Sequence, residues 1–196
     1  VRYYRGKKFT IYSEVYEPEE DTYLLADNLD VSPEELVLEV GTGCGLLAVL
    51  CAEAGASVIA TDINPKAVQC ARENAEKLSV ADKIIFLEGD LFEPVDGKFD
   101  LVIFNPPYLP VEEDEGDDDL IEKAWAGGSD GREVLDVFLD QVEEYLNPTG
   151  RFFFVQSSLT GKKKTVEKLR RNGLRFEIEE KKISFERLYL FKVFLD

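Results

Sequence analysis

The chain has 196 residues, of which 44% are hydrophobic and 32% are charged. These values are typical of a single globular domain with its own core, and they exclude a wholly disordered chain. Acids outnumber bases by 40 to 23, and the formal net charge of -17 repels phosphate backbones, which makes duplex DNA or bulk RNA an unfavourable partner.

The apolar pattern alternates along the chain between that of strands and that of helices. An N-terminal helix is expected within residues 15–29, beginning at Pro18. Gly55 is the expected end of the next helix, and Asn64 and Pro65 suit the N-cap and first turn of the one after it. The predicted strands cover residues 36–40, 58–61, 83–92, 101–104, 151–156, 175–183 and 186–195. The later helices are expected at residues 132–146 and 165–171, with a turn at 147–150.

Strands that alternate with helices predict an α/β fold with a mostly parallel sheet covered on both faces. The last two strands alternate apolar and polar residues, as an antiparallel pair does. No linker or internal repeat divides the chain, so we expect one domain over residues 1–196. Residues 1–35 form a helical lead-in to it, and residues 111–130 form an acidic mobile loop.

A glycine-rich turn joins the first core strand to the helix after it. Gly41, Gly43 and Gly45 let the backbone turn sharply and let a ligand approach it. The dinucleotide fingerprint requires its third glycine at position 46, which is leucine here, so NAD is disfavoured. The Gly-x-Gly-x-Gly spacing, with Glu39 before it, suits S-adenosylmethionine (SAM). SAM has no pyrophosphate, and a carboxylate can orient its cationic amino acid end.

Acidic residues end the next two strands. Asp62 follows Gly41 by 21 residues, and an acid at this place can bind both hydroxyls of a ribose. Asp90 ends the third strand, where it either meets the adenine amino group or belongs to a simple turn. Open α/β sheets bind ligands outside the carboxyl ends of their strands, so these acids are expected to share one site with Gly41 and Asn105.

The fourth strand ends in the stretch Asn105, Pro106, Pro107 and Tyr108. One interpretation is a strand terminator, and the other is a clamp for methyl transfer to a planar nitrogen. The Asn105 side-chain oxygen and the Pro106 carbonyl would accept from an NH2 group, while Tyr108 stacks on the flat amide or base. The prolines fix the backbone and pre-organise these acceptors. The sulfonium loses its charge on transfer, so no general base is required.

Other chemistry is restricted by composition. The chain has no histidine, which excludes His-based triads and His-ligated zinc, and we expect no metal. Cys44, Cys51 and Cys70 match no metal or redox spacing and are expected to be reduced and half-buried. No apolar run is long enough for a membrane helix, and no basic and apolar leader opens the sequence, so a cytoplasmic location is expected.

The glycine turn together with the Asn-Pro-Pro-Tyr stretch resembles the class I SAM-dependent methyltransferases, whose amino-methylating members carry (N/D)PP(Y/F). The segments VYEPEEDTYLLADNL (15–29) and WAGGSDGREVLD (125–136) are similar to the HemK-like protein N5-glutamine methyltransferases of the short archaeal and eukaryotic branch. This resemblance covers essentially the whole chain. It implies a single Rossmann-like, seven-stranded class I methyltransferase domain that uses SAM to methylate the glutamine of the GGQ motif in a class 1 translation release factor.

The resemblance also implies roles for individual residues. The implied cofactor-binding residues are Thr22, Glu39, Gly41, Gly43, Gly45, Asp62, Ile63, Asp90, Leu91 and Asn105. The implied catalytic clamp is Asn105, Pro106, Pro107 and Tyr108.

Partners are implied as well. The bacterial branch has an extra N-terminal domain that docks the release factor, and this chain has only about 35 residues before its first core strand. Members of the short branch work as heterodimers with a small zinc-binding activator that pairs with a sheet edge. That edge would be the strand from Ile84 to Leu87, whose unbroken apolar run is an aggregation risk if bare, although its side chains equally suit a core.

Three other functions remain open. An adenine-N6 or guanine-N2 nucleic-acid methyltransferase would use the same clamp, but the net charge and the lack of a recognition domain disfavour it. A protein lysine methyltransferase would have to deprotonate its acceptor. A SAM-binding scaffold would have no need to orient an acceptor amide.

Two charged stretches and one aromatic residue have open roles. Residues 111–122 hold eight acids and are expected to form a solvated connection, a lid or an attractor for a basic partner. Residues 161–175 hold seven Lys or Arg and form either a solvated helix face or a contact to RNA or an acidic partner. Trp125 is either a core anchor or part of a substrate rim.

Overall fold

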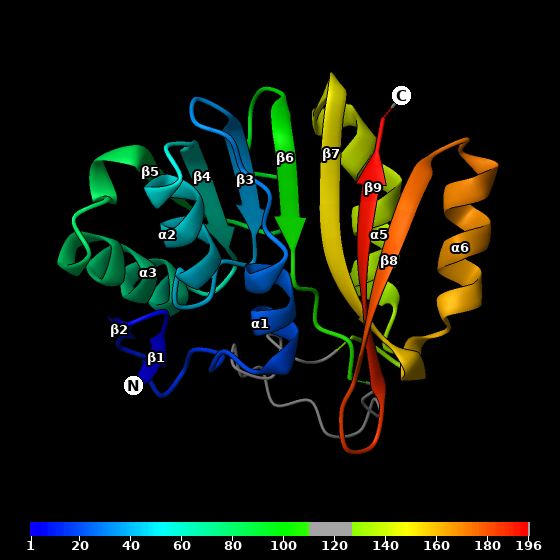
Figure 1. Cartoon of the computed structure of the whole chain (residues 1–196), viewed down its shortest axis with the longest axis horizontal. Helices are drawn as coiled ribbons and strands as arrows, with labels where there is room; N and C mark the ends of the chain where they lie inside the picture. The colour runs from blue at the N-terminus through cyan, green and yellow to red at the C-terminus, as the bar shows by residue number, and fades with distance from the viewer. Residues whose placement is uncertain (110–126, 196) are drawn as a thin grey trace.

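The computed structural model describes residues 1–109 and 127–195. Its centre is a seven-stranded sheet in the order β5-β4-β3-β6-β7-β9-β8 (Figure 1). Strands β5 to β7 are parallel, and β9 runs antiparallel to both β7 and β8. The strands are β3 (Leu36–Val40), β4 (Ser57–Asp62), β5 (Ile84–Glu88), β6 (Phe99–Phe104), β7 (Leu146–Ser157), β8 (Arg175–Lys182) and β9 (Arg187–Phe194). The predicted Rossmann-like fold is therefore confirmed.

Helices cover both faces of this sheet, as Figure 1 shows. Among the described residues, one apolar cluster packs α1, α2 and α3 on one face, and a second packs α5 and α6 on the other. Side chains of β6 alternate between them, with Leu101 and Ile103 in the first cluster and Val102 and Phe104 in the second. The helices are α1 (Glu20–Asp27), α2 (Leu46–Glu53), α3 (Pro65–Lys77), α5 (Glu133–Gln141) and α6 (Lys162–Arg171).

The N-terminal region differs from the expectation of a purely helical lead-in. A two-stranded antiparallel hairpin, β1 (Arg2–Tyr4) and β2 (Lys7–Phe9), precedes α1. Three-residue strands are too short to show a clear period of two in the sequence, so they were not predicted. The helix α1 begins at Glu20 rather than at Pro18, and Pro18 instead lines the cavity described below.

Three other boundaries differ from the sequence expectations. Residues 147–150, expected as a turn, lie within β7, where the pairing with β6 shifts register between Phe99 and Leu101. The fifteen-residue helix expected from residue 132 ends at Gln141 and continues as a 3-10 helix, η3 (Val142–Tyr145). The helix expected from Thr165 begins three residues earlier, because its three lysines form its first turn.

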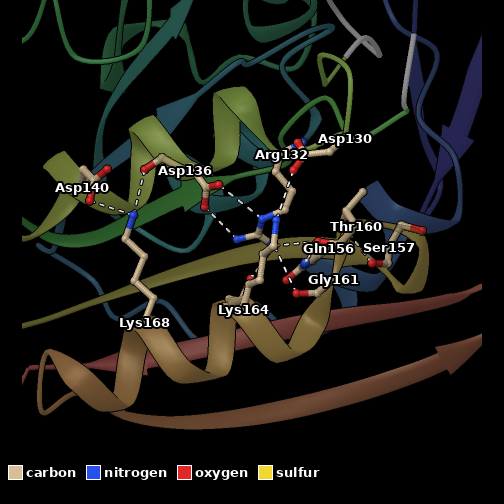
Figure 2. A network of polar contacts seen from close by, with 11 residues as sticks. Asp130, Arg132, Asp136, Asp140, Gln156, Ser157, Thr160, Gly161, Lys164 and Lys168 are labelled. Atoms are coloured by element: carbon tan, nitrogen blue, oxygen red, sulfur yellow. Dashed lines mark hydrogen bonds and ion pairs between the residues drawn. The ribbon is translucent and has the colours of Figure 1, made fainter. Parts of the chain in front are cut away.

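Part of the basic stretch pairs with acids of the same chain. Helix α6 buries Thr165 and Leu169. Lys168 forms an ion pair with Asp140 at 2.7 Å, and Lys164 lies 3.4 Å from Asp130. Figure 2 shows these lysines reaching from α6 toward α5. These contacts favour a partly solvated structural helix over a dedicated RNA contact.

The three cysteines are free thiols in the structure, and all are buried rather than half-buried. Burial raises the pKa of Cys70. These thiols are therefore protonated packing groups. Along the described ranges, no helix has the length and apolar character needed to cross a membrane. The acidic residues 111–122 and Trp125 lie outside the described residues.

The strand order reverses between β3 and β6, because the chain runs outward from β3 to β5 and then returns to β6. A crevice forms at such a switch point, outside the carboxyl ends of the strands. In Figure 1 the arrows of β3 and β6 point to the end of the sheet where α1, the β1–β2 hairpin and the β8–β9 turn also lie. The topology thus brings the glycine turn and Asn105 to the same crevice.

Candidate active site

A cavity of about 800 Å³ occupies this crevice. Its size falls in the range of small-molecule sites. Its walls contain every residue that was expected to bind the cofactor or to form the clamp, except Gly45. These are Thr22, Glu39, Gly41, Gly43, Asp62, Ile63, Asp90, Leu91, Asn105, Pro106, Pro107 and Tyr108.

Gly45 serves packing rather than the cavity wall. It is the N-cap of α2, with φ at +82°. A Cβ at this position would lie 2.9 Å from the Cβ and 3.0 Å from the Cα of Ala71 in α3. Glycine is thus required where the two helices approach each other, and the expected contact of Gly45 with a cofactor has no support in the geometry.

Glu39 anchors the start of α2. Its carboxylate accepts from the Thr42 hydroxyl at 2.7 Å and from the Ala48 N–H at 3.0 Å, which satisfies one of the free N–H groups in the helix's first turn. The side chain is fully buried, and this burial raises the pKa of Glu39 to about 8. A cationic group bound in the cavity would stabilise its ionised form.

The raised pKa predicts a pH-dependent stability that depends on Glu39. Between pH 4.5, the ordinary pKa of a glutamate, and about pH 8, Glu39 is protonated in the folded state but ionised in the unfolded state. The free energy of unfolding therefore decreases as pH rises through that window. We expect Glu39→Gln to make this decrease in the free energy of unfolding less steep, by up to about 1.4 kcal/mol per pH unit. Urea unfolding of the cofactor-free protein from pH 5 to 9 measures it. Glu88→Gln, at the exposed end of β5, is the control, and equal slopes for all three proteins would contradict the prediction.

Asp62 fixes the glycine turn to the end of β4. One carboxylate oxygen accepts from the Gly43 N–H at 2.9 Å, and the other accepts from the Asn64 N–H at 2.9 Å. The pKa of Asp62 is raised because the side chain is buried, and the two hydrogen bonds offset part of this rise. The residue also lines the cavity, so it links the shape of the turn to whatever ligand binds there.

The turn after β5 forms a further part of the wall. Leu91 has a φ of +44°, which is unfavourable for a residue with a side chain. The turn is tied to β4 through the Gly89 N–H, which donates to the Asp62 carbonyl at 3.0 Å. Asp90 is exposed at the rim of this wall. Strained backbone of this kind is often found at ligand sites.

Asn105 lines the cavity and has an unused acceptor. Its Nδ2 group donates to the Thr22 hydroxyl at 3.3 Å. Its Oδ1 atom is buried and has no hydrogen-bond partner among the described residues. A buried polar atom without a partner costs free energy in the empty protein, so this oxygen is suited to a ligand that brings its own donor.

Tyr108, at the other end of the clamp, is held from α1. Its hydroxyl donates to Asp21 Oδ2 at 3.2 Å, and the Tyr16 hydroxyl donates to the same oxygen at 3.0 Å. Asp21 is 2% exposed. Burial and the neighbouring carboxylate raise the pKa of both phenols, which therefore keep their protons and act as donors.

A buried arginine fixes the segment that packs behind Tyr108. Gly131 approaches so closely that a Cβ there would lie 2.4 Å from the Tyr108 carbonyl oxygen. Arg132, 2% exposed, donates to the Thr160 carbonyl at 2.6 Å and pairs with Asp136 at 2.7 Å. Figure 2 shows this side chain reaching from the start of α5 to the turn before α6. The clamp is thus supported from both sides.

Several residues in or next to this site were not predicted from the sequence. Asp21 was detectable, because it lies on the same face of α1 as Leu24 and Leu25, and an acid on an apolar helix face is unusual. Tyr16, Arg132 and Glu186 gave no comparable signal. They reach the site only through tertiary packing, Glu186 from the β8–β9 turn.

The charge of the wall restricts its ligand. Among the described residues that line the cavity, six are acids and none is lysine or arginine: Glu19, Asp21, Glu39, Asp62, Asp90 and Glu186. Such a wall disfavours phosphates and favours a ligand with positive charge. The cationic SAM, which has no phosphate, fits this wall, and NAD does not. Fold and cavity together define a class I SAM-dependent methyltransferase.

Comparison with known proteins leads to the same class and narrows it. The model of the methyltransferase small domain family matches residues 10–183. A Methanocaldococcus jannaschii protein assigned as a protein N5-glutamine methyltransferase is 48% identical over 185 residues, which cover 93% of each chain. The chain belongs to the methyltransferase small domain family, and within it to the HemK-like protein N5-glutamine methyltransferases.

More distant relatives show the same relationship. The human methyltransferase HEMK2 is 38% identical over 173 residues, covering 83% of this chain and 81% of the relative. The structure of the E. cuniculi Mtq2–Trm112 complex, described as responsible for methylation of the eRF1 translation termination factor, contains a chain with a TM-score of 0.71 and 26% identity. The match covers 93% of this chain and 99% of that one.

Proposed function

We propose that this enzyme transfers the methyl group of SAM to the side-chain amide nitrogen of a glutamine, in the GGQ motif of a class 1 translation release factor. The observation that carries the proposal concerns Asn105, a residue of the cavity wall, whose buried Oδ1 has no hydrogen-bond partner among the described residues. An amide NH2 offers the donor that this oxygen lacks. The names of the relatives, which include a release factor glutamine methyltransferase from Geobacter sulfurreducens at 34% identity, support the choice of acceptor.

The proposed clamp compensates for the weak nucleophilicity of an amide nitrogen. The lone pair of its nitrogen is delocalised, so the nitrogen must pyramidalise before it attacks. Asn105 Oδ1 and the Pro106 carbonyl would hold the two N–H bonds, and Tyr108 would cover the flat face of the amide. When bound, SAM would supply an electrophilic methyl group on a positively charged sulfur, and the sulfur would be left as a neutral thioether. The amide nitrogen would lose one of its two N–H protons to solvent as it gains the methyl group.

The acid-rich wall argues against the other acceptors. The acidic side chains around the cavity, together with the net charge of -17, repel a nucleic-acid backbone. The same carboxylates would raise the pKa of a lysine ammonium group and so keep it protonated and without a free lone pair. A neutral amide avoids both penalties.

The direct test is methyl transfer from labelled SAM to a purified class 1 release factor. We expect labelling of the wild-type factor and none of a factor whose GGQ glutamine is changed to asparagine. The assay is run with and without a small activator subunit. Absence of labelling in all four combinations would overturn the release-factor assignment and leave the methyltransferase fold unaffected. We also propose a cytoplasmic location, where translation terminates.

A small zinc-binding activator subunit is proposed to bind β5. Among the described strands, β5 is one of the two edges of the sheet, as the family resemblance implied. Ile84 and Phe86 are buried against the α2 and α3 side, whereas Ile85 points to the opposite face and is 59% exposed. A partner would cover both this apolar side chain and the free backbone edge. The solved complex of Mtq2 with Trm112 supports a partner of this kind.

We therefore expect Ile85→Lys to weaken activator binding by about tenfold or more, because one buried isoleucine contributes about 1.5–3 kcal/mol. Calorimetric titration of the purified chain with the activator measures the effect. Val137→Lys, on α5 at 44% exposure, is the matched control. Equal affinities for the two variants would place the activator elsewhere.

A further inference from the structure

Two consecutive residues of α1 contact both ends of the clamp. Thr22 Oγ1 accepts from Asn105 Nδ2 at 3.3 Å, and Asp21 Oδ2 accepts from the Tyr108 hydroxyl at 3.2 Å. The two are joined to each other, since the Thr22 hydroxyl lies 3.2 Å from Asp21 Oδ1. Asp21 and Thr22 are 2% and 8% exposed, so water competes little for these contacts.

The chemistry of the carboxylate fixes the direction of each hydrogen bond. A carboxylate has only acceptor sites, whereas a hydroxyl has one donor and two acceptors. The Thr22 hydroxyl must therefore donate its proton to Asp21 and is left as an acceptor toward Asn105. The amide can satisfy that acceptor only with its NH2 group, which turns its Oδ1 atom away from Thr22.

We propose that Asp21 is a positioning residue that orients the Asn105 amide through Thr22 and holds Tyr108 directly, so that α1 braces both ends of the clamp. The inference rests on the proposed function, because an oriented Oδ1 matters only for an acceptor that brings an N–H. Asp21, the middle residue of the Glu-Asp-Thr segment at residues 20–22, would then affect the rate of methyl transfer rather than the binding of the cofactor.

Tyr16 adds a second support to this brace. Its hydroxyl donates to the same Asp21 oxygen as Tyr108, at 3.0 Å. Asp21 Oδ1 also accepts from the Thr22 backbone N–H at 2.5 Å. The carboxylate thus receives donors on both oxygens and cannot rotate without breaking several bonds. A fixed carboxylate is what a positioning role requires.

The structure offers a matched control on the same helix. Asp27 also accepts from a phenol, the Tyr4 hydroxyl at 2.6 Å, but it is exposed and is not among the residues that line the cavity. Removing either carboxylate breaks an aspartate–tyrosine contact of α1. Only the removal of Asp21 also frees the Asn105 amide.

The test measures kcat for the release factor and, separately, the Kd for SAM. We expect Asp21→Ala to lower kcat by about tenfold or more while the Kd changes by less than about threefold. Asp21→Asn keeps an oxygen for Thr22 and recovers part of the rate. Asp27→Ala leaves kcat within about twofold of the wild type. Equal losses for Asp21→Ala and Asp27→Ala, or a loss confined to the Kd, would overturn the proposal.

A second pair of variants covers the case in which Asp21→Ala does not fold. Thr22→Val removes the hydroxyl with little change in shape, and Thr22→Ser keeps it. We expect the Asn105 side-chain NH2 resonance, identified by its absence in Asn105→Ala, to move in Thr22→Val and to stay in place in Thr22→Ser. This readout needs no acceptor, so failure of the brace and failure of the proposed function are distinguished. An unchanged resonance in both variants would overturn the brace.

Discussion

Replacement of Asn105 by alanine is expected to lower the rate of methyl transfer by about 100-fold or more, the cost of removing one positioned polar group from a reacting centre. The buried Oδ1 of Asn105 has no other partner among the described residues, so its removal leaves the acceptor NH2 without its orienting contact. Single-turnover labelling of the release factor with saturating SAM measures the effect on the methyl-transfer step.

The variant is expected to remain folded and to bind SAM. Removing Oδ1 eliminates an unsatisfied buried atom, which offsets part of the lost contact with Thr22. We expect the Kd for SAM to change by less than about tenfold, far less than the rate. Asn147→Ala removes a half-buried amide that donates to Asp100 at 2.7 Å, remote from the cavity, and is the control. A rate loss in Asn105→Ala that matches the loss in Asn147→Ala would show that the clamp is not the reacting site.

The sheet was predictable because its central strands are buried on both faces. The residues of β3 and β6 form short, nearly continuous apolar runs. Each run is followed or preceded along the chain by a segment whose apolar residues have the spacing of a helix. The antiparallel β8 and β9 were predictable from their alternation. The β1–β2 hairpin was not, since three-residue strands carry no measurable period. Nor was the irregular part of β7, where tertiary pairing outweighs the local preference of Asn-Pro-Thr-Gly for a turn.

The part of the site that lies at strand ends was predictable for a topological reason. Parallel strands place their carboxyl ends on one edge, so Gly41, Asp62, Asp90 and Asn105 could be grouped without coordinates. The support from other elements was not predictable. Arg132 follows Gly131, which packs on Tyr108, and it bonds to the turn before α6. Glu186 comes from the β8–β9 turn, more than 80 residues along the chain from Asn105. Such contacts depend on packing that no local pattern encodes.

Replacement of Asp62 by alanine is expected to weaken SAM binding by about 100-fold or more, or about 2.7 kcal/mol. Two effects act together. The carboxylate itself is lost from the cavity wall, and the Gly43 and Asn64 N–H groups, both 2.9 Å from it, lose the acceptor that holds the glycine turn in place. Isothermal titration of the purified protein with SAM measures the Kd, and urea unfolding measures the accompanying loss of stability of about 1–3 kcal/mol.

Asp100 supplies a matched control that separates these two effects. It is a half-buried aspartate at the opposite end of the same sheet, and it also holds two partners: the Leu36 N–H at 2.9 Å and the Asn147 amide at 2.7 Å. We expect Asp100→Ala to lose a similar amount of stability and to keep its affinity for SAM. If both variants bound SAM equally weakly, the loss would reflect a weakened sheet. If Asp62→Ala bound SAM as tightly as the wild type, the ligand would have to lie elsewhere in the cavity, away from the end of β4.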